Sequence, residues 1–372
     1  MRIRTEADGE STEHKILLDR QRRVYTGVVG DLVTANVDGA GFYRVVPDAA
    51  MLEHLRRHGP SRMATRERHS LVDDMWALTL TGRMDASTYF EIVTSGFAGE
   101  DDVTVWQALS AGIGGLRHLI DGVALERFAE AIDRLCGPVM ARLGPEGDDA
   151  EDDRTRELRA TILRLRGAIA DLPDAVDEAR GLLESTDATL AAAALTVAAH
   201  HGSNDDFERF RDRFRAARDA QTEQRHLHAL ADFPDTALVM SIVEETRGGE
   251  VRSQDGPYLI RRALTNRHAG TLVWAFVTDH WDQLNETFPS NSIVRMLEGI
   301  VALDDPDRAS SVSSFLAEHP VPQGHKQLEQ HLERLSINVA LRAREANRFA
   351  ASLVTDRPSP DPSRPHHSAP IR

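Results

Sequence analysis

Most of the chain repeats apolar residues three or four positions apart, with short polar breaks between the repeats. Four such stripes cover residues 71–78, 105–116, 125–139 and 207–214. Residues at this spacing lie on one face of an α-helix, and such a face is more often buried than used for binding. Glycine, proline and aspartate recur between the stripes, so we expect helices of about ten to twenty residues joined by short turns. The pattern predicts a mainly α fold, an α-α superhelix of degenerate HEAT-like repeats.

The beginning of the chain follows a different pattern. Short β-prone runs at residues 14–18, 23–27, 32–36 and 42–46 are separated by turn signals such as Asp38-Gly39. Four strands of this length predict a small sheet with open edges.

The end of the chain is rich in proline, with five prolines among the last 17 residues. Such a segment is typical of disorder. We therefore expect a β-strand segment at 1–46, a helical domain at 47–352 and a disordered Pro-rich tail at 353–372.

Composition narrows the choice of partners and compartment. The net charge of −15 repels phosphate backbones, so we expect no nucleic-acid partner. The longest apolar run, residues 190–199, is shorter than the roughly 20 residues that a bilayer requires. The first ten residues have no secretory pattern, and the single cysteine, Cys136, is expected to be a buried thiol. We expect a cytoplasmic protein without a membrane partner.

Four blocks of sequence carry a family resemblance. They cover residues 36–45, 71–83, 250–284 and 315–341, and the first includes the sequence Gly-Phe-Tyr-Arg-Val. Their order and spacing resemble the aminopeptidase N family of zinc peptidases, in particular its puromycin-sensitive branch. There the matching region is the end of a small β-domain and a helical C-terminal domain, a bowl that closes over the catalytic domain and helps to hold the peptide. The resemblance therefore implies a short β-sandwich remnant followed by a helical bowl.

The catalytic motifs of that family do not occur in this sequence. Its members bind zinc through His-Glu-x-x-His on a helix and bind the peptide amine through Gly-Ala-Met-Glu-Asn. None of the 16 histidines is followed by glutamate, and only 35 residues precede the first block. The pair His54 and His58 has helical spacing but no third ligand, so we expect both to face solvent. We predict no catalytic residue and no metal ligand here, with zinc only in a partner catalytic domain.

Two residues are candidates for peptide binding. Asn291 and Arg295 follow Pro289 at the predicted start of a helix, where Ser290 or Asn291 would be the cap. Members of the puromycin-sensitive branch resemble this chain in carrying an arginine at the position of Arg295. An arginine that faces the bowl binds a peptide carboxylate with two N–H groups, whereas the commoner use is a salt bridge, for example to Glu298.

Two functions remain open at this stage. The chain is either the non-catalytic, peptide-enclosing C-terminal part of an aminopeptidase N-like enzyme, as a truncated product or separate subunit, or a stand-alone superhelical scaffold for a protein or peptide segment. In both cases we expect no peptidase activity from this chain alone.

Overall fold

The computed structural model describes residues 1–7, 10–17, 30, 32–144, 147 and 151–355. Over these ranges the protein is mainly helical, with seventeen α-helices and one three-stranded sheet. The prediction of a mainly α fold after a small sheet is therefore confirmed. The expected strand at 23–27 and the tail from residue 356 onward lie outside the described residues.

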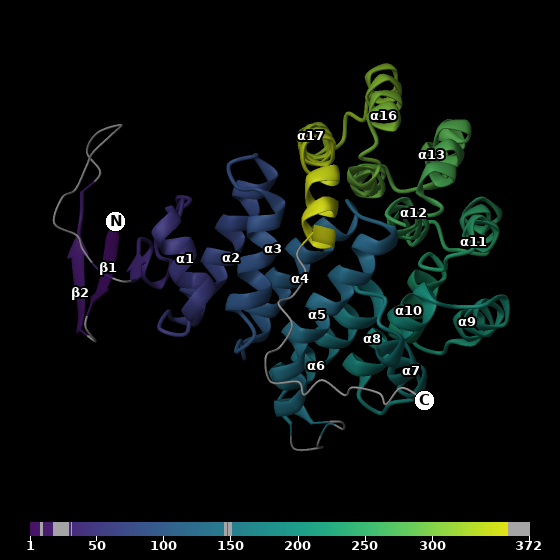
Figure 1. Cartoon of the computed structure of the whole chain (residues 1–372). Helices are drawn as coiled ribbons and strands as arrows, with labels where there is room; N and C mark the ends of the chain where they lie inside the picture. The colour runs from purple at the N-terminus through teal and green to yellow at the C-terminus, as the bar shows by residue number, and fades with distance from the viewer. Residues whose placement is uncertain (8–9, 18–29, 31, 145–146, 148–150, 356–372) are drawn as a thin grey trace, which may run out of the picture.

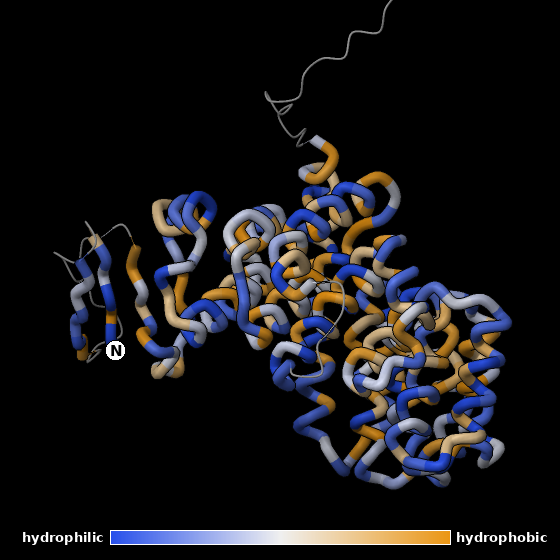
Figure 2. The backbone as a smooth tube through the Cα atoms, turned by 90° about the horizontal axis from the view of Figure 1, so that it is seen from below, coloured by the Kyte–Doolittle hydropathy of each residue, from blue (hydrophilic) through white to orange (hydrophobic). Residues whose placement is uncertain are grey.

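The sheet consists of β1 (Arg2–Ala7), β2 (Glu10–Lys15) and β3 (Leu32–Thr34), all antiparallel, in the order β2-β1-β3. It lies at one end of the helical body (Figures 1 and 2). The expected strands at 14–18 and 32–36 overlap β2 and β3.

The central strand, β1, was not predicted because charged residues interrupt its apolar pattern. Arg4 forms two hydrogen bonds to Glu67 in the helical part, with N···O distances of 3.0 and 2.5 Å. Glu6 forms an ion pair with Arg62 at 2.5 Å. Contacts from residues far along the chain thus stabilise charges that local sequence makes unfavourable in a strand.

The expected strand at 42–46 is wrong, because this segment is a loop that lies against helix α2 (Thr65–Leu80). The Val45 N–H, which a strand would use for pairing, donates to Asp74 at 3.0 Å. The Arg44 side chain donates to Asp74 at 3.0 Å and also pairs with Asp73, and the Tyr43 hydroxyl donates to the Ala35 carbonyl at 2.8 Å. Asp74 of the helix therefore takes the Val45 backbone donor that a sheet would have needed.

The first eight helices are α1 (Ala49–His58), α2 (Thr65–Leu80), α3 (Ala86–Gly96), α4 (Val103–Arg117), α5 (Gly122–Leu143), α6 (Asp153–Arg164), α7 (Pro173–Gly181) and α8 (Ala188–His200). The other nine are α9 (Asn204–Ala216), α10 (Ala220–Leu230), α11 (Thr236–Gly248), α12 (Gly256–Leu264), α13 (Gly270–Asp279), α14 (Trp281–Thr287), α15 (Ser290–Met296), α16 (Pro306–Glu318) and α17 (His325–Thr355). Short 3-10 turns η1 (Val37–Gly39) and η3 (Leu297–Ala302) and a π-helical turn η2 (Leu165–Ile169) complete the described elements.

The helices form two rows. In the inner row α2, α4, α6, α8, α10 and α12 contact one another in succession, and α12 then contacts α15 and η3. Figure 1 shows α9, α11, α13 and α16 on the outer edge of the same arc. The predicted stripes on α2, α4 and α5 pack in one hydrophobic cluster and the stripe on α9 packs in another, and every one of their spaced apolar residues except Leu125 is buried.

Helix α17 joins the two ends of the arc. It contacts η3, α15 and α16 on one side, and α2, α3 and α5 on the other. Glu345, only 2% exposed, accepts a hydrogen bond from the Ala86 N–H at 3.1 Å, and Arg344 donates to the Thr79 carbonyl at 2.8 Å. The C-terminal helix therefore closes the helical array onto its first members.

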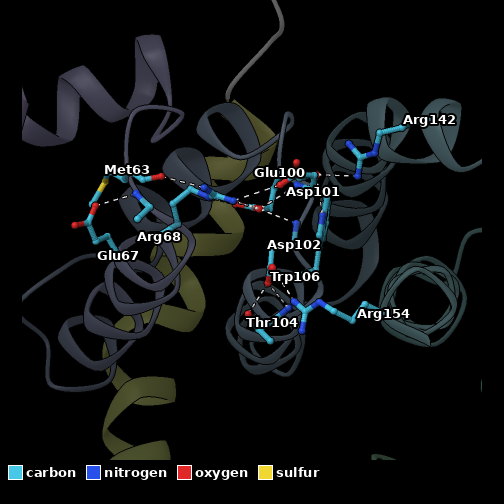
Figure 3. A network of polar contacts seen from close by, with 11 residues as sticks. Met63, Glu67, Arg68, Glu100, Asp101, Asp102, Thr104, Trp106, Arg142 and Arg154 are labelled. Atoms are coloured by element: carbon cyan, nitrogen blue, oxygen red, sulfur yellow. Dashed lines mark hydrogen bonds and ion pairs between the residues drawn. The ribbon is translucent and has the colours of Figure 1, made fainter. Parts of the chain in front are cut away.

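A buried ion pair, which we call the Glu100 cluster, fixes the α3–α4 turn against α2 (Figure 3). Arg68 donates to both carboxylate oxygens of Glu100, at 2.7 and 2.8 Å, and to the Met63 carbonyl at 3.0 Å. Glu100, 4% exposed, also accepts from the backbone N–H groups of Asp101 and Asp102, both at 2.9 Å. Because each buried charge has several partners, the cluster holds the turn rigidly.

Candidate functional site

The main cavity lies where the inner helices end. Its volume is about 750 Å³, a size typical of ligand sites. The charged and histidine side chains that line it come from the ends of α4 and α8, from the turns that follow α4, α10, α12 and η3, and from α16 and α17. They are Arg117, His118, Asp121, His200, Asp232, Arg267, His268, Asp304, Arg308 and Arg342. Helix α17 contributes Arg342 to this wall, where the side chain donates to the His118 carbonyl just after α4.

Asp171 connects two walls of the main cavity. Arg117 donates to its carboxylate at 2.9 Å, and Arg267, 96 residues further along, donates at 3.3 and 3.4 Å. Nε2 of His201 lies 3.5 Å from the same carboxylate and 2.8 Å from the Gly167 carbonyl. Burial by itself would raise the pKa of Asp171, but Arg117 and Arg267 outweigh it, and the pKa lies below its ordinary value. Asp171 is therefore ionised and shared between two arginines.

Two histidines of the cavity have lowered pKa values. His118 lines the cavity, where the surrounding protein desolvates its ring. This desolvation lowers its pKa, as do Arg117 and Arg342, while Asp304 opposes the shift. The pKa of His268 is lowered by desolvation and then by Arg267. Both side chains are therefore neutral near pH 7.

A second, smaller cavity of about 360 Å³ lies beside the main one, between α10, α12 and η3. The two share Thr265, and Arg262 of the second donates to Asp232 of the first at 2.8 and 2.5 Å. Nε2 of His228 is buried here and has no hydrogen-bond partner among the described residues. Burial and then Arg262 lower the pKa of His228, so its ring is neutral.

Neither of the two predicted binding residues is among those that line the two cavities, but Arg295 contacts a residue that lines the second one. Arg295 donates to the hydroxyl of Tyr258, which lines the cavity, at 3.1 Å. Asn291 is exposed near the start of α15 and lies outside the residues that line either cavity. The helix begins after Pro289 without a side-chain cap, so the predicted cap by Ser290 or Asn291 is wrong.

The salt-bridge alternative for Arg295 does not hold in the described chain, because Glu298 pairs with Arg261 at 2.9 Å instead. Arg261 also lies over the ring of Tyr258, 5.5 Å from its centroid. Tyr258, Arg261 and the residues of the main cavity were not predicted as functional. No motif marks them, since they meet only after the helices stack.

Other candidate chemistry has structural explanations. Cys136 is buried, and desolvation raises the pKa of its thiol to about 12, as expected for a structural cysteine. The rings of His54 and His58 lie 5.0 Å apart in α1, with His58 exposed and His54 half-buried. Within the described ranges no three histidine, cysteine, aspartate or glutamate side chains converge as metal ligands would. None of the helices seen there is both long and apolar enough to cross a membrane.

Comparison with known proteins identifies the family. Residues 32–337, more than three quarters of the chain, match the family described as the ERAP1-like C-terminal domain. The chain therefore belongs to this family, and the resemblance inferred from the four sequence blocks is confirmed.

Its relatives are aminopeptidases. The chain is 23% identical to Aminopeptidase M1 of Arabidopsis thaliana over 82% of its own length and 36% of that protein. It is 24% identical to the puromycin-sensitive aminopeptidase of Caenorhabditis elegans, over 72% and 29% of the two chains. It is 25% identical to the glutamyl aminopeptidase of Sus scrofa, over 82% and 34%. The chain thus spans about a third of the length of the curated relatives it matches.

Proposed function

We propose that this chain is the non-catalytic, peptide-enclosing bowl of an aminopeptidase N-like zinc peptidase. The observation that carries the proposal is the closure of the helical array by α17 around the main cavity. The two rows of helices along one arc support an α-α superhelix of HEAT-like type (Figure 1). Such an array presents a concave wall to a peptide, and the hydrolysis of the peptide is carried out by another domain.

That chemistry would come from a catalytic aminopeptidase domain, with zinc held by residues of that domain. The relatives named above are aminopeptidases of which this chain matches only about a third. A cytoplasmic location, with peptides as partners and neither nucleic acid nor membrane, agrees with the composition and the net charge of −15.

Arg295 is the residue proposed to hold a carboxylate of the enclosed peptide, with Asn291 beside it on α15. Its side chain forms one hydrogen bond within the described chain, to the Tyr258 hydroxyl, which leaves N–H groups for a ligand. Arg261 over the ring of the same tyrosine adds a second positive charge at this place. A guanidinium group binds a carboxylate through two parallel hydrogen bonds.

Fluorescence anisotropy of the full chain with a labelled peptide tests this proposal. We expect saturable binding without release of amino acids, and about five- to tenfold weaker binding by Arg295→Ala. The loss should disappear when the peptide ends in an amide instead of a carboxylate. Arg127→Ala, which removes an exposed arginine paired with Glu130 on α5, is the matched control. Failure to bind any peptide, or cleavage by this chain alone, would refute the proposal.

A stand-alone scaffold remains the second candidate, because the array closes within a single chain. Affinity capture from a cell extract distinguishes the two. Recovery of a protein that contains His-Glu-x-x-His supports the bowl, whereas recovery of an unrelated protein with no such motif supports the scaffold.

A further inference from the structure

The charges that line the two cavities reverse the balance of the whole chain. The chain has 59 acidic and 44 basic residues. The cavities are lined by six arginines and by four carboxylates, and Asp171 behind Arg117 and Arg267 adds a fifth. Over both cavities this is an excess of one positive charge. The main cavity alone has four arginines against four carboxylates, Asp171 included, so its wall is balanced inside an acidic protein, which is a local preference that the surface as a whole does not have.

Helix ends oppose this preference, since the C-terminal end of a helix carries partial negative charge. Here the protein's own side chains already satisfy the carbonyls at these ends. Arg342 donates to the His118 carbonyl at 2.6 Å, Asn266 to the carbonyls of Ala231 and Phe233 at 2.9 Å each, and Asn338 to that of Val301 at 2.8 Å. The carbonyl acceptors at these helix ends are therefore used.

Donors, in contrast, remain available. The side chain of Arg308, on the first turn of α16, lines the main cavity and has no ion pair or hydrogen bond in the described part of the chain. Arg117 and Arg267 share one carboxylate, with the longer distances at Arg267. A ligand that completes such a wall must supply acceptor oxygens and negative charge.

We infer that the main cavity recognises carboxylate side chains, so that the peptide best suited to this bowl is an acidic one. The inference rests on the proposed function, because it specifies which peptides the bowl holds. It concerns side chains in the body of the peptide, at Arg308 and its neighbours, and is separate from the terminal carboxylate proposed at Arg295. The lowered pKa of Asp171 agrees with a positive potential at this wall.

The test compares three labelled peptides that differ only at three internal positions, which carry glutamate, glutamine or lysine, against the full chain. Each partly exposed ion pair is worth roughly two- to fivefold in a binding constant. We therefore expect the glutamate peptide to bind on the order of tenfold tighter than the lysine peptide, with the glutamine peptide between them. The net charge of −15 by itself predicts the opposite order.

The variant Arg308→Glu tests whether the preference for the glutamate peptide arises in the main cavity. This substitution should weaken binding of the glutamate peptide and strengthen binding of the lysine peptide. Arg127→Glu, the same charge change on the exposed face of α5, should alter the binding of both peptides far less. Arg308 is exposed, so the variant should melt like the parent chain.

The outcomes separate this inference from the proposed function. Equal binding of the three peptides, or equal effects of the two variants, overturns the acidic preference and leaves the bowl intact. If none of the peptides binds, both the inference and the proposed function fail.

Discussion

The Glu100 cluster and the main cavity contain the same kinds of residue but use them differently. In the Glu100 cluster, Arg68 has three nitrogens bonded, and the carboxylate it holds accepts four hydrogen bonds while only 4% of the residue is exposed. In the cavity, no side-chain nitrogen of Arg308 is bonded to any of the described residues. Complete pairing in a buried place makes a cluster structural, and unused donors around an open space make one suitable for binding. Residue type alone does not separate the two cases.

The largest effect on stability is expected from a substitution that breaks the Glu100 cluster. Arg68→Ala leaves the Glu100 carboxylate buried with only backbone donors, so we expect a loss of about 3 kcal/mol in the free energy of unfolding. Urea denaturation measures it, with Arg127→Ala expected to stay within about 0.5 kcal/mol of the parent. Peptide binding by the folded variant should be unchanged. A stability loss as small as that of the control would show that the cluster is not structural.

A smaller effect is expected where the array closes. Glu345 is as buried as Glu100, but its main buried partner is one backbone N–H, that of Ala86. Glu345→Gln keeps the acceptor and loses the charge that pairs with Arg344 and Arg348, so we expect about 1–2 kcal/mol of destabilisation.

Because α17 shapes the main cavity, Glu345→Gln should also weaken peptide binding, unlike Arg68→Ala. Thermal unfolding and anisotropy on the same sample give both quantities. Full binding together with reduced stability would mean that the closure is not needed for the cavity.

The smallest expected effect is a pH dependence of the free energy of unfolding that arises from two histidines of the main cavity. In the unfolded chain His118 and His268 take up protons near their ordinary pKa of about 6.5. In the folded chain their pKa values are lower, so the unfolded state binds more protons as the pH falls. Their contribution to stability is thus complete above about pH 6.5 and is lost as the pH falls toward the folded values.

The double variant His118→Gln with His268→Gln should flatten the pH dependence of unfolding between pH 7 and pH 5. Protonation also adds positive charge to the wall, so acidic peptides should bind the parent more tightly at pH 5.5 than at pH 7.5. An unchanged pH profile in the double variant would assign the titration to other groups.

Local sequence was sufficient to predict the helices and the family. Apolar residues such as Leu109 and Phe128 recur at the helical period, and burial follows from that period because one face of each helix must leave water. Local patterns gave the wrong secondary structure at β1 and at 42–46, where contacts with residues far along the chain determine the conformation. There, charged side chains of α2 and its neighbours bind the strand and the loop.

The cavities depend on tertiary structure alone. Arg117, Arg267 and Arg342 are separated by 75 residues or more and belong to no common motif. They line one space because each inner helix stacks on the next and α17 returns to the first ones. Helical period is a property of neighbours three or four residues apart, whereas a concave wall depends on how successive helices turn relative to one another, which no short pattern records.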